Sequence, residues 1–241
     1  MRLFKTTILF AALVFPSLQG MAHAGDFATR AILGFSEDGS RFAFEEFGRQ
    51  DGSGFPYSNI YVINTATDQW TAGSPFRVLI QDENASEDDA RDQARDQAGN
   101  ALSVIRQPGV HAATNQQLEI VDNPHRMAAK PYVFNPPTSD SIEFRIEEIP
   151  VTPPEMCKDF GETKAFRLKQ IFSEPGKATR LLHEDDGVPS SRRCPLSYRF
   201  ADILTYYPDN GPAVAAILIL MEQVGFEGPD GRYLAVTTQL D

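Results

Sequence analysis

The adjacent residues Arg192 and Arg193 have side chains suited to recognising an anion. A guanidinium group presents several N–H donors in one plane, and these match the oxygens of a carboxylate or a phosphate. The chain has 22 Lys and Arg against 33 Asp and Glu, so the two arginines lie on a protein with a net charge of −11. The alternative is that both arginines pair with neighbouring surface carboxylates.

A second group of candidate residues surrounds the glycine-rich loop between residues 48 and 56. Neighbouring residues of a strand point to opposite faces of a sheet, so at most one of Glu45 and Glu46 points into a cleft. The loop either binds a ligand with aromatic contacts or is a polar strand end at the surface. Together with the two arginines, the predicted ligand-binding residues are Glu46, Asp51, Phe55, Tyr57, Asn59, Arg192 and Arg193.

The stretch from His183 to Asp186 combines an imidazole with carboxylates, which are ligands for divalent cations. His183, Asp185 and Asp186 are therefore weak candidates for a metal site. The alternative is that Asp185 and Asp186 begin a turn with Gly187 while His183 ends a strand. We predict no metal site, because ligand identity without geometry is weak support for one.

Motifs of several enzyme classes are absent from the sequence. There is no nucleophile elbow, no His-Glu-x-x-His zinc motif, no phosphate-binding loop, no dinucleotide-binding glycine motif and no EF-hand loop. We therefore predict neither a catalytic residue nor a cofactor.

The chain contains two cysteines, Cys157 and Cys194. In an exported protein such a pair predicts a disulfide bond, which would close a loop of about 38 residues and stabilise the fold by about 4 kcal/mol. The alternative is two free thiols, one of which could be catalytic if its pKa were lowered by a partner.

The first 24 residues have the pattern of a cleaved signal peptide. Arg2 and Lys5 precede an apolar stretch from Thr6 to Leu18, and Ala22-His23-Ala24 is a cleavage site of small residues. The apolar stretch is shorter than the roughly 20 residues that a membrane anchor needs. We predict a soluble protein of the periplasm of a Gram-negative bacterium, or a secreted one, without stable membrane insertion after cleavage.

Removal of Arg2 and Lys5 leaves 20 basic against 33 acidic residues, a net charge of −13. A protein this acidic is not drawn to nucleic acid or to anionic lipid by its overall charge. We predict that its partner is an unknown envelope protein or a small ligand, and not a nucleic acid.

Most of the chain beyond the signal peptide consists of short strand patterns separated by turns. One helix, over about residues 86–106, is predicted by the N-cap candidate Ser86 and by alanines on one face at positions 90, 94 and 98. Ala213–Met221 is apolar throughout, which fits a strand buried on both faces. The expected strands are 29–35, 41–47, 59–64, 69–70, 75–81, 117–121, 132–134, 141–149, 165–172, 179–183, 197–206, 213–221 and 232–238.

This pattern predicts a mainly β fold of antiparallel sheets, propeller-like or a sandwich, with one inserted helix. Residues 25–241 are expected to form a single domain, with a possible sub-domain boundary near residues 150–154, where Val151-Thr152-Pro153-Pro154 is a stiff connector.

The segment Phe35–Trp70 resembles one blade of the β-propellers of periplasmic TolB-like proteins, through Phe35–Phe44, Ser58–Asn64 and Thr65–Trp70. Gly228–Val236 repeats the turn and second strand of that blade. In a propeller, the resemblance implies that the two chain ends pair in one sheet. The alternative is that a good hairpin sequence is used twice.

The chain as a whole resembles a family of predicted secreted bacterial proteins of unknown function. The resemblance rests on the sequences Gly25–Ile63, Leu182–Ile203 and Gly225–Val236. It implies export and a shared fold, and no activity.

The predicted function is a non-catalytic binding or interaction module of the cell envelope, which presents loops from a rigid sheet scaffold. The alternative is a hydrolase acting on an envelope carbohydrate or ester, with carboxylates such as Glu45 or Asp186 as acid or base. A third possibility is a structural envelope protein.

Overall fold

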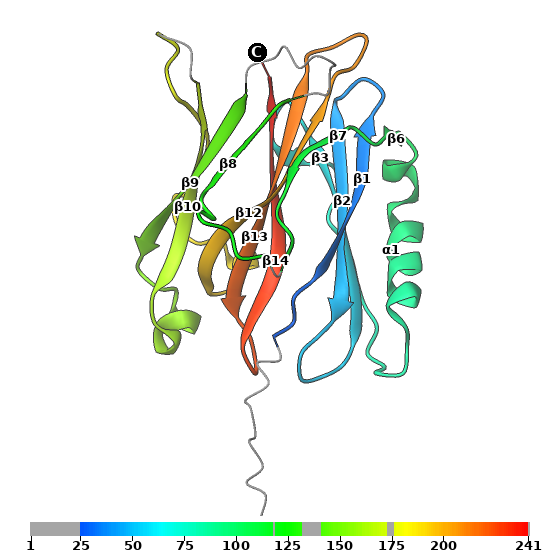
Figure 1. Ribbon diagram of the computed structural model, residues 1–241. Helices are drawn as coiled ribbons and strands as arrows, with labels where there is room; N and C mark the ends of the chain where they lie inside the picture. Colours follow the sequence, from blue (N-terminus) through cyan, green and yellow to red (C-terminus); the bar gives the residue numbers. More distant parts are fainter. Residues whose placement is uncertain (1–24, 118, 132–140, 173–175, 241) are drawn as a thin grey trace, which may run out of the picture.

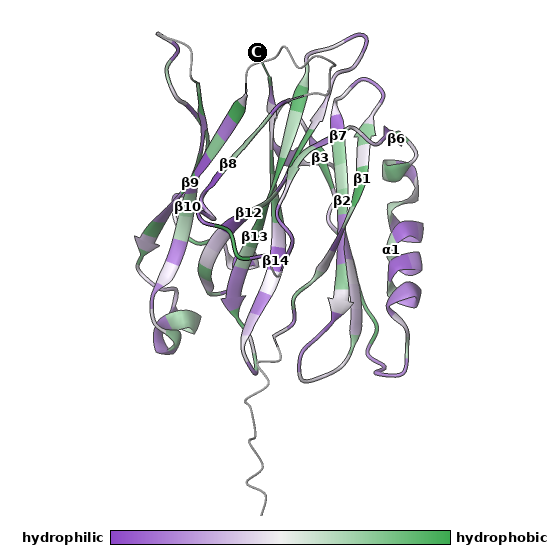
Figure 2. Ribbon diagram, viewed as in Figure 1, coloured by the Kyte–Doolittle hydropathy of each residue, from purple (hydrophilic) through white to green (hydrophobic). Residues whose placement is uncertain are grey.

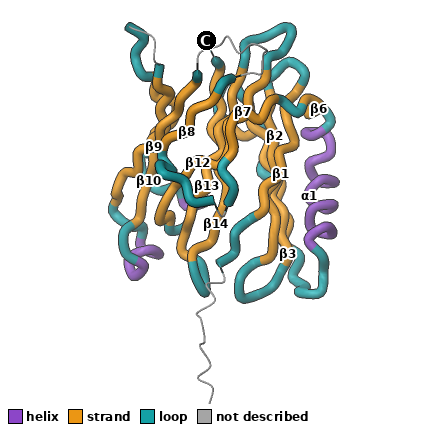
Figure 3. The backbone as a smooth tube through the Cα atoms, viewed as in Figure 1, coloured by secondary structure: helices purple, strands orange, loops and turns teal. Residues whose placement is uncertain are grey.

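The computed structural model describes residues 25–117, 119–131, 141–172 and 176–240. These residues form three antiparallel β-sheets and one long helix, which are stacked face to face (Figure 1). The order of the layers is helix, first sheet, middle sheet and third sheet. Strands account for most of the described chain, and loops connect them mainly at the two ends of the stack (Figure 3).

The first sheet contains the six strands β1 to β6, in the order β4-β3-β2-β1-β6, with β5 also paired to β3. Its N-terminal part is a simple meander, in which short turns connect β1 to β2 and β3 to β4, and the loop at residues 50–55 connects β2 to β3. The strands are β1 Thr29–Ser36, β2 Arg41–Arg49, β3 Pro56–Asn64, β4 Gln69–Trp70, β5 Phe76–Leu79 and β6 Ile105–Gln107.

The middle and third sheets have four strands each, in the orders β14-β13-β12-β7 and β11-β10-β9-β8. The middle sheet contains β7 Val110–Thr114, β12 Pro195–Tyr206, β13 Val214–Val224 and β14 Pro229–Gln239. The third sheet contains β8 Arg126–Ala129, β9 Ile142–Val151, β10 Thr163–Ile171 and β11 Arg180–Glu184. Two short 3-10 helices, η1 Glu155–Phe160 and η2 Ser190–Arg192, lie in the connections.

Strand β13 is buried on both faces, as its apolar sequence predicts. Ala216, Leu218 and Leu220 face the first sheet and pack in a core with Phe42 and Phe44. The alternate residues of β13, namely Ala215, Ile217, Ile219 and Met221, face the third sheet. The middle sheet is apolar along this strand (Figure 2), because a layer covers each of its faces.

Helix α1, Glu87–Leu102, covers the outer face of the first sheet through Ala90, Ala94 and Ala98, which are buried. Ser86 caps its N-terminus in a capping box with Asp89, while the outer face is polar (Figure 2). The predicted helix extended to about residue 106. It ends at Leu102, because residues 105–107 pair with β1 instead and form the edge strand β6.

The fold is a stacked sandwich, and the described residues form no closed propeller. Phe35–Trp70 does fold as consecutive antiparallel strands, but its sheet packs face to face on the middle sheet. The second copy of the blade-like sequence, Gly228–Val236, has another geometry. The turn predicted at Gly228–Gly231 lies earlier, and β14 already begins at Pro229.

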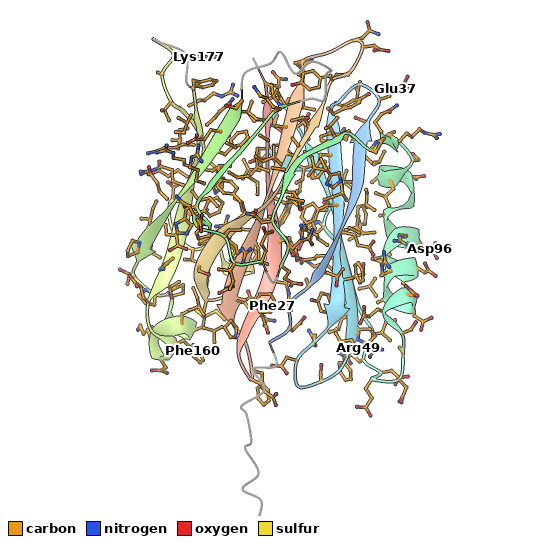
Figure 4. All side chains as sticks on the ribbon, in the orientation of Figure 1. Phe27, Glu37, Arg49, Asp96, Phe160 and Lys177 are labelled. Atoms are coloured by element: carbon orange, nitrogen blue, oxygen red, sulfur yellow. A yellow bond between two sulfur atoms is a disulfide. The ribbon has the colours of Figure 1, made fainter. Side chains whose placement is uncertain are left out.

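Gly231 is required for a close approach within the strand and not for a turn. A Cβ atom at Gly231 would lie 2.3 Å from the ring of Phe27. The segment around Phe27 runs alongside β14, with backbone hydrogen bonds from Ala28 to Gly231 and from Gly231 to Asp26. Side chains fill the spaces between the layers, and Phe27 lies beside the middle sheet (Figure 4).

Several smaller expectations were wrong or are not described. Residues 117–121 form no strand where the structure describes them, whereas the strands β7 and β8 were missed because they are short and lack a clear alternation. The expected strand at residues 132–134 and the signal peptide lie outside the described residues. Strand β9 alternates as predicted, with Phe144 and Ile146 buried.

Cys157 and Cys194 form the predicted disulfide bond, with a Cα–Cα distance of 5.5 Å. The bond joins η1 to the segment that follows η2, and therefore fixes the chain next to Arg193. Residues 152–154 connect β9 to η1, and β9 and β10 pair along their length within the third sheet.

Candidate functional site

A cleft of about 360 Å³ lies beside β14, the edge strand of the middle sheet. Its lining comes from strands β2, β3, β4 and β5 of the first sheet, from β13 and β14 of the middle sheet, and from η2 with Arg193. We call it the arginine cleft. Its lining residues include Glu46, Gln50, Tyr57, Asn59, Tyr61, Trp70, Arg77, Ser191, Arg192, Arg193, Gln223, Arg232 and Tyr233.

Two of the four arginines in the arginine cleft are neutralised by buried carboxylates. Arg192 lies 2.5 Å from Asp185, and its guanidinium packs over the ring of Phe166. Arg232 is held in the same way by Asp26. These two side chains therefore act chiefly as parts of the scaffold.

The other two arginines, Arg77 and Arg193, are exposed and have no carboxylate partner within the described residues. Arg77 lies on β5 with its guanidinium 6.0 Å from the centre of the Trp70 ring. Arg193 follows η2 directly and has a backbone φ of 52°. The arginine cleft thus holds two uncompensated positive charges on a protein whose overall charge is −11.

Glu46 is the one carboxylate among the described residues that line the arginine cleft, and its oxygens are already occupied. Oε1 accepts hydrogen bonds from Asn59 at 3.0 Å and from the Tyr61 hydroxyl at 2.8 Å. Oε2 accepts the backbone N–H of Tyr233 at 2.8 Å. Burial, and next the charge of Glu46, hold the pKa of Tyr61 well above its ordinary value, so the phenol stays a donor to Glu46.

Gln223 on β13 is a buried polar residue of the arginine cleft that is only 4 % exposed. Its side-chain amide has no hydrogen-bond partner among the described residues. No atom of this amide is enclosed without a partner, so the amide reaches solvent in the cleft and is open to a ligand.

Five of the seven predicted ligand-binding residues line the arginine cleft, although they come from distant parts of the chain. They are Glu46, Tyr57, Asn59, Arg192 and Arg193. The other two lie in the neighbouring loop and do not line the cleft. Asp51 accepts the backbone N–H of Glu227 instead, and the carbonyl of Phe55 accepts the N–H of Gln50.

The sequence did not single out Trp70, Arg77, Gln223 or Arg232. Trp70, Arg77 and Arg232 lie in expected strands, where a lone polar or aromatic residue is ordinary, and Gln223 lies just beyond the expected strand 213–221. Only the position of β14 between the edges of two other sheets brings them together. The one signal in the sequence for these four residues was the presence of Arg77 in a short expected strand. An arginine in such a strand is too common to indicate a binding site.

The weak metal candidates, His183, Asp185 and Asp186, either make contacts with other protein groups or are exposed to solvent. Asp185 contacts His183 at 2.8 Å through one oxygen, and Arg192 and the N–H of Phe166 through the other. Burial acts to raise its pKa, but the bonds from His183 and Arg192 lower it below the ordinary value. Asp186 is exposed. In the described part of the chain, no group of three His, Cys, Asp or Glu residues is arranged to hold a metal ion.

Glu45 lies on the opposite face of the first sheet from Glu46, under helix α1. It is fully buried and pairs with Arg91 at 3.0 Å and with Arg95 at 2.9 Å. Ser58 donates a further hydrogen bond. A role of Glu45 as acid or base in the arginine cleft is therefore contradicted by its position.

The sequence model of a protein family described as "Predicted secreted protein (DUF2259)" matches residues 43–239. Comparison with the curated proteins found no match, and comparison with the solved structures found none either. Among the described residues, no helix is long and apolar enough to cross a membrane.

Proposed function

The chain belongs to this family of predicted secreted proteins, and we propose that it is an exported binding module that recognises an anionic ligand in the arginine cleft. The mature protein, residues 25–241, would act in the periplasm as one domain after removal of its signal peptide. The ligand would be a carboxylate or a phosphate, as the predicted role of Arg192 and Arg193 already suggests.

The observation that carries the proposal is the pair of uncompensated arginines that line the arginine cleft, Arg77 from β5 of the first sheet and Arg193 from the segment after η2. An acidic protein would ordinarily place neighbouring carboxylates against exposed arginines. Here the nearest lining carboxylate, Glu46, is buried and occupied. An anion in the cleft would find planar donors on both guanidinium groups.

The remaining lining residues favour binding over catalysis. Carboxylates that the hydrolase alternative requires are either absent from the lining or fully hydrogen-bonded, as Glu46 is. The cleft volume of about 360 Å³ lies within the range of small-molecule sites. Gln223 supplies an additional polar contact to a ligand.

The test is isothermal titration calorimetry of the mature protein with sodium acetate and with inorganic phosphate at constant ionic strength. We expect saturable binding of at least one of these anions. Arg77→Gln and Arg193→Gln should each weaken it tenfold or more, because each removes a charge-assisted hydrogen bond.

Arg106→Gln is the matched control. Arg106 is also exposed, but it lines a different pocket and donates to the carbonyl of Ser103. Its substitution should leave the affinity unchanged. Equal losses in all three variants would indicate a general charge effect and would contradict a specific site.

A further inference from the structure

A second pocket of about 390 Å³ adjoins the arginine cleft, and we call it the aromatic pocket. The two share a common wall, so they form one continuous groove along β14. The shared residues are Tyr61, Trp70, Ser191, Arg192, Tyr233 and Leu234. The residues specific to the aromatic pocket include Phe44, Ile63, Phe166, His183, Ala235 and Val236.

The aromatic pocket is lined by rings that are stacked on one another. The rings of Phe44 and Tyr61 stack with centroids 4.7 Å apart at 9°, and those of Phe166 and His183 stack 4.7 Å apart at 23°. Trp70 is half exposed where the two pockets meet. Phe44 and Phe166 are each only 1 % exposed, so Trp70 and the apolar side chains of β14 supply the surface that a planar apolar group would contact.

Two polar side chains of the aromatic pocket, Asp68 and His183, are engaged with the protein. Asp68 accepts the N–H of Thr237 at 2.7 Å and its hydroxyl at 3.0 Å. The imidazole of His183 contacts Asp185 at 2.8 Å. Positive charge without a carboxylate partner is therefore found at the arginine end of the groove, on Arg77 and Arg193.

The edge of β14 indicates that the ligand is a small molecule and not an added peptide strand. Carboxylates occupy the outward N–H groups of Tyr233 and Thr237, through Glu46 and Asp68. Strand addition would have to displace both, and inward-pointing charges of this kind protect sheet edges. Between them, alternation leaves the outward N–H of Ala235 without an acceptor among the described residues.

We propose that the groove binds an arylalkyl acid, with its anionic group between Arg77 and Arg193 and its aromatic ring in the aromatic pocket. This inference rests on the proposed anion-binding function and adds the chemical class of the ligand. The outward N–H of Ala235 can donate a hydrogen bond to a carbonyl oxygen in the linker of the ligand. Amide or ester linkers are therefore compatible with the groove. Charge at one end and stacked rings at the other are the complementarity that selects this class.

The experiment compares four probes by calorimetry on the wild-type mature protein. They are acetate, hexanoate, 4-phenylbutyrate and the neutral 4-phenylbutanol. We expect 4-phenylbutyrate to bind at least tenfold more tightly than acetate and more tightly than hexanoate, while 4-phenylbutanol binds at least tenfold more weakly than 4-phenylbutyrate.

A pocket-filling variant, Ala235→Leu, should remove the advantage of 4-phenylbutyrate and leave acetate affinity unchanged. Its folding is checked by circular dichroism, and the wild-type comparison decides the matter if the variant does not fold. Equal affinities of acetate and 4-phenylbutyrate would overturn this inference and leave anion binding intact. Equal affinities of 4-phenylbutyrate and 4-phenylbutanol, or no binding of any acid, would overturn both. Tighter binding of an extended tetrapeptide than of 4-phenylbutyrate would overturn the small-molecule assignment.

Discussion

Glu45 and Glu46 are neighbours on β2 and hold two different parts of the molecule together. Glu45 fixes helix α1 to the first sheet through Arg91 and Arg95. Glu46 holds the edge of β14 through the N–H of Tyr233. Their opposite orientations follow from the alternation of a strand, which the sequence shows. Their partners do not, because no local pattern indicates which distant segment will face each carboxylate.

Substitution of Glu46 by Gln should lower the free energy of unfolding by about 1–3 kcal/mol. The amide has a single acceptor oxygen, so it cannot replace the carboxylate toward Asn59, Tyr61 and Tyr233 together. Denaturant unfolding measures the change. Glu37→Gln, at an exposed turn, is the control and should stay within about 0.5 kcal/mol of the wild type. A Glu46→Gln variant as stable as this control would contradict the described network.

Asp38, in the turn between β1 and β2, provides a test by pH. Hydrogen bonds from the Ser36 hydroxyl and from the N–H and hydroxyl of Ser40 lower its pKa from 3.8 to about 2. Since the folded pKa is depressed, the ionised group stabilises the fold above pH 3.8, and this contribution is lost as the pH falls toward 2.

Asp38→Asn should therefore be less stable than the wild type at pH 6 by less than about 1 kcal/mol, because the group is largely exposed. At pH 2 most of this difference should be lost, because Asp38 is then half protonated in the folded state and protonated in the unfolded state. Thermal unfolding at both pH values measures the difference. A difference that persists at pH 2 would show that Asp38 acts through its shape and not through its charge.

Helix α1 illustrates, at the scale of an element, what local sequence determines. The N-cap at Ser86 and the buried alanines were readable from residue types and spacing. The C-terminal end was not, because Ile105–Gln107 exchange helical bonds for pairing with β1, which lies far away in sequence. The turn expected near Gly231 was misplaced for a similar reason, since the ring of Phe27 decides the requirement for glycine there.

Ser86→Ala should reduce stability by about 1 kcal/mol, because it leaves the N–H of Asp89 without its side-chain acceptor. The matched control is Asp96→Asn on the outer face of the same helix (Figure 4). Denaturant unfolding should show little change for this variant. A loss in the control as large as in Ser86→Ala would mean that the helix responds to its overall charge and not to its cap.

The stacking of three sheets is the property of the whole molecule that the sequence predicted least. Strand positions followed from alternation and turn residues, and the disulfide bond from cysteine count and compartment. The two-faced burial of β13 was visible in its uninterrupted apolar sequence. The order of the layers, and hence the presence of Arg77 and Arg193 in one cleft, depends on long-range packing that one sequence does not display.

Because β13 contributes to both cores, damage on either face should be felt by the whole molecule. Ile217→Ala and Leu218→Ala, neighbours on opposite faces, should each cost about 2–5 kcal/mol. In both variants, unfolding followed by Trp70 fluorescence and by far-ultraviolet circular dichroism should coincide in one transition. Leu181→Ala, at a side chain that is 52 % exposed, is the control with a small effect. Two separated transitions would contradict a single domain.

The central claim is that the arginine cleft binds an anion, and Trp70 reports on it directly. It is the single tryptophan of the chain, and it lines the cleft beside Arg77. The decisive measurement is the fluorescence of the mature protein during titration with 4-phenylbutyrate and with phosphate at constant ionic strength. The account predicts a saturable change that Arg193→Gln shifts to at least tenfold higher concentration. A signal that stays flat, or that saturates identically in Arg193→Gln, would contradict it.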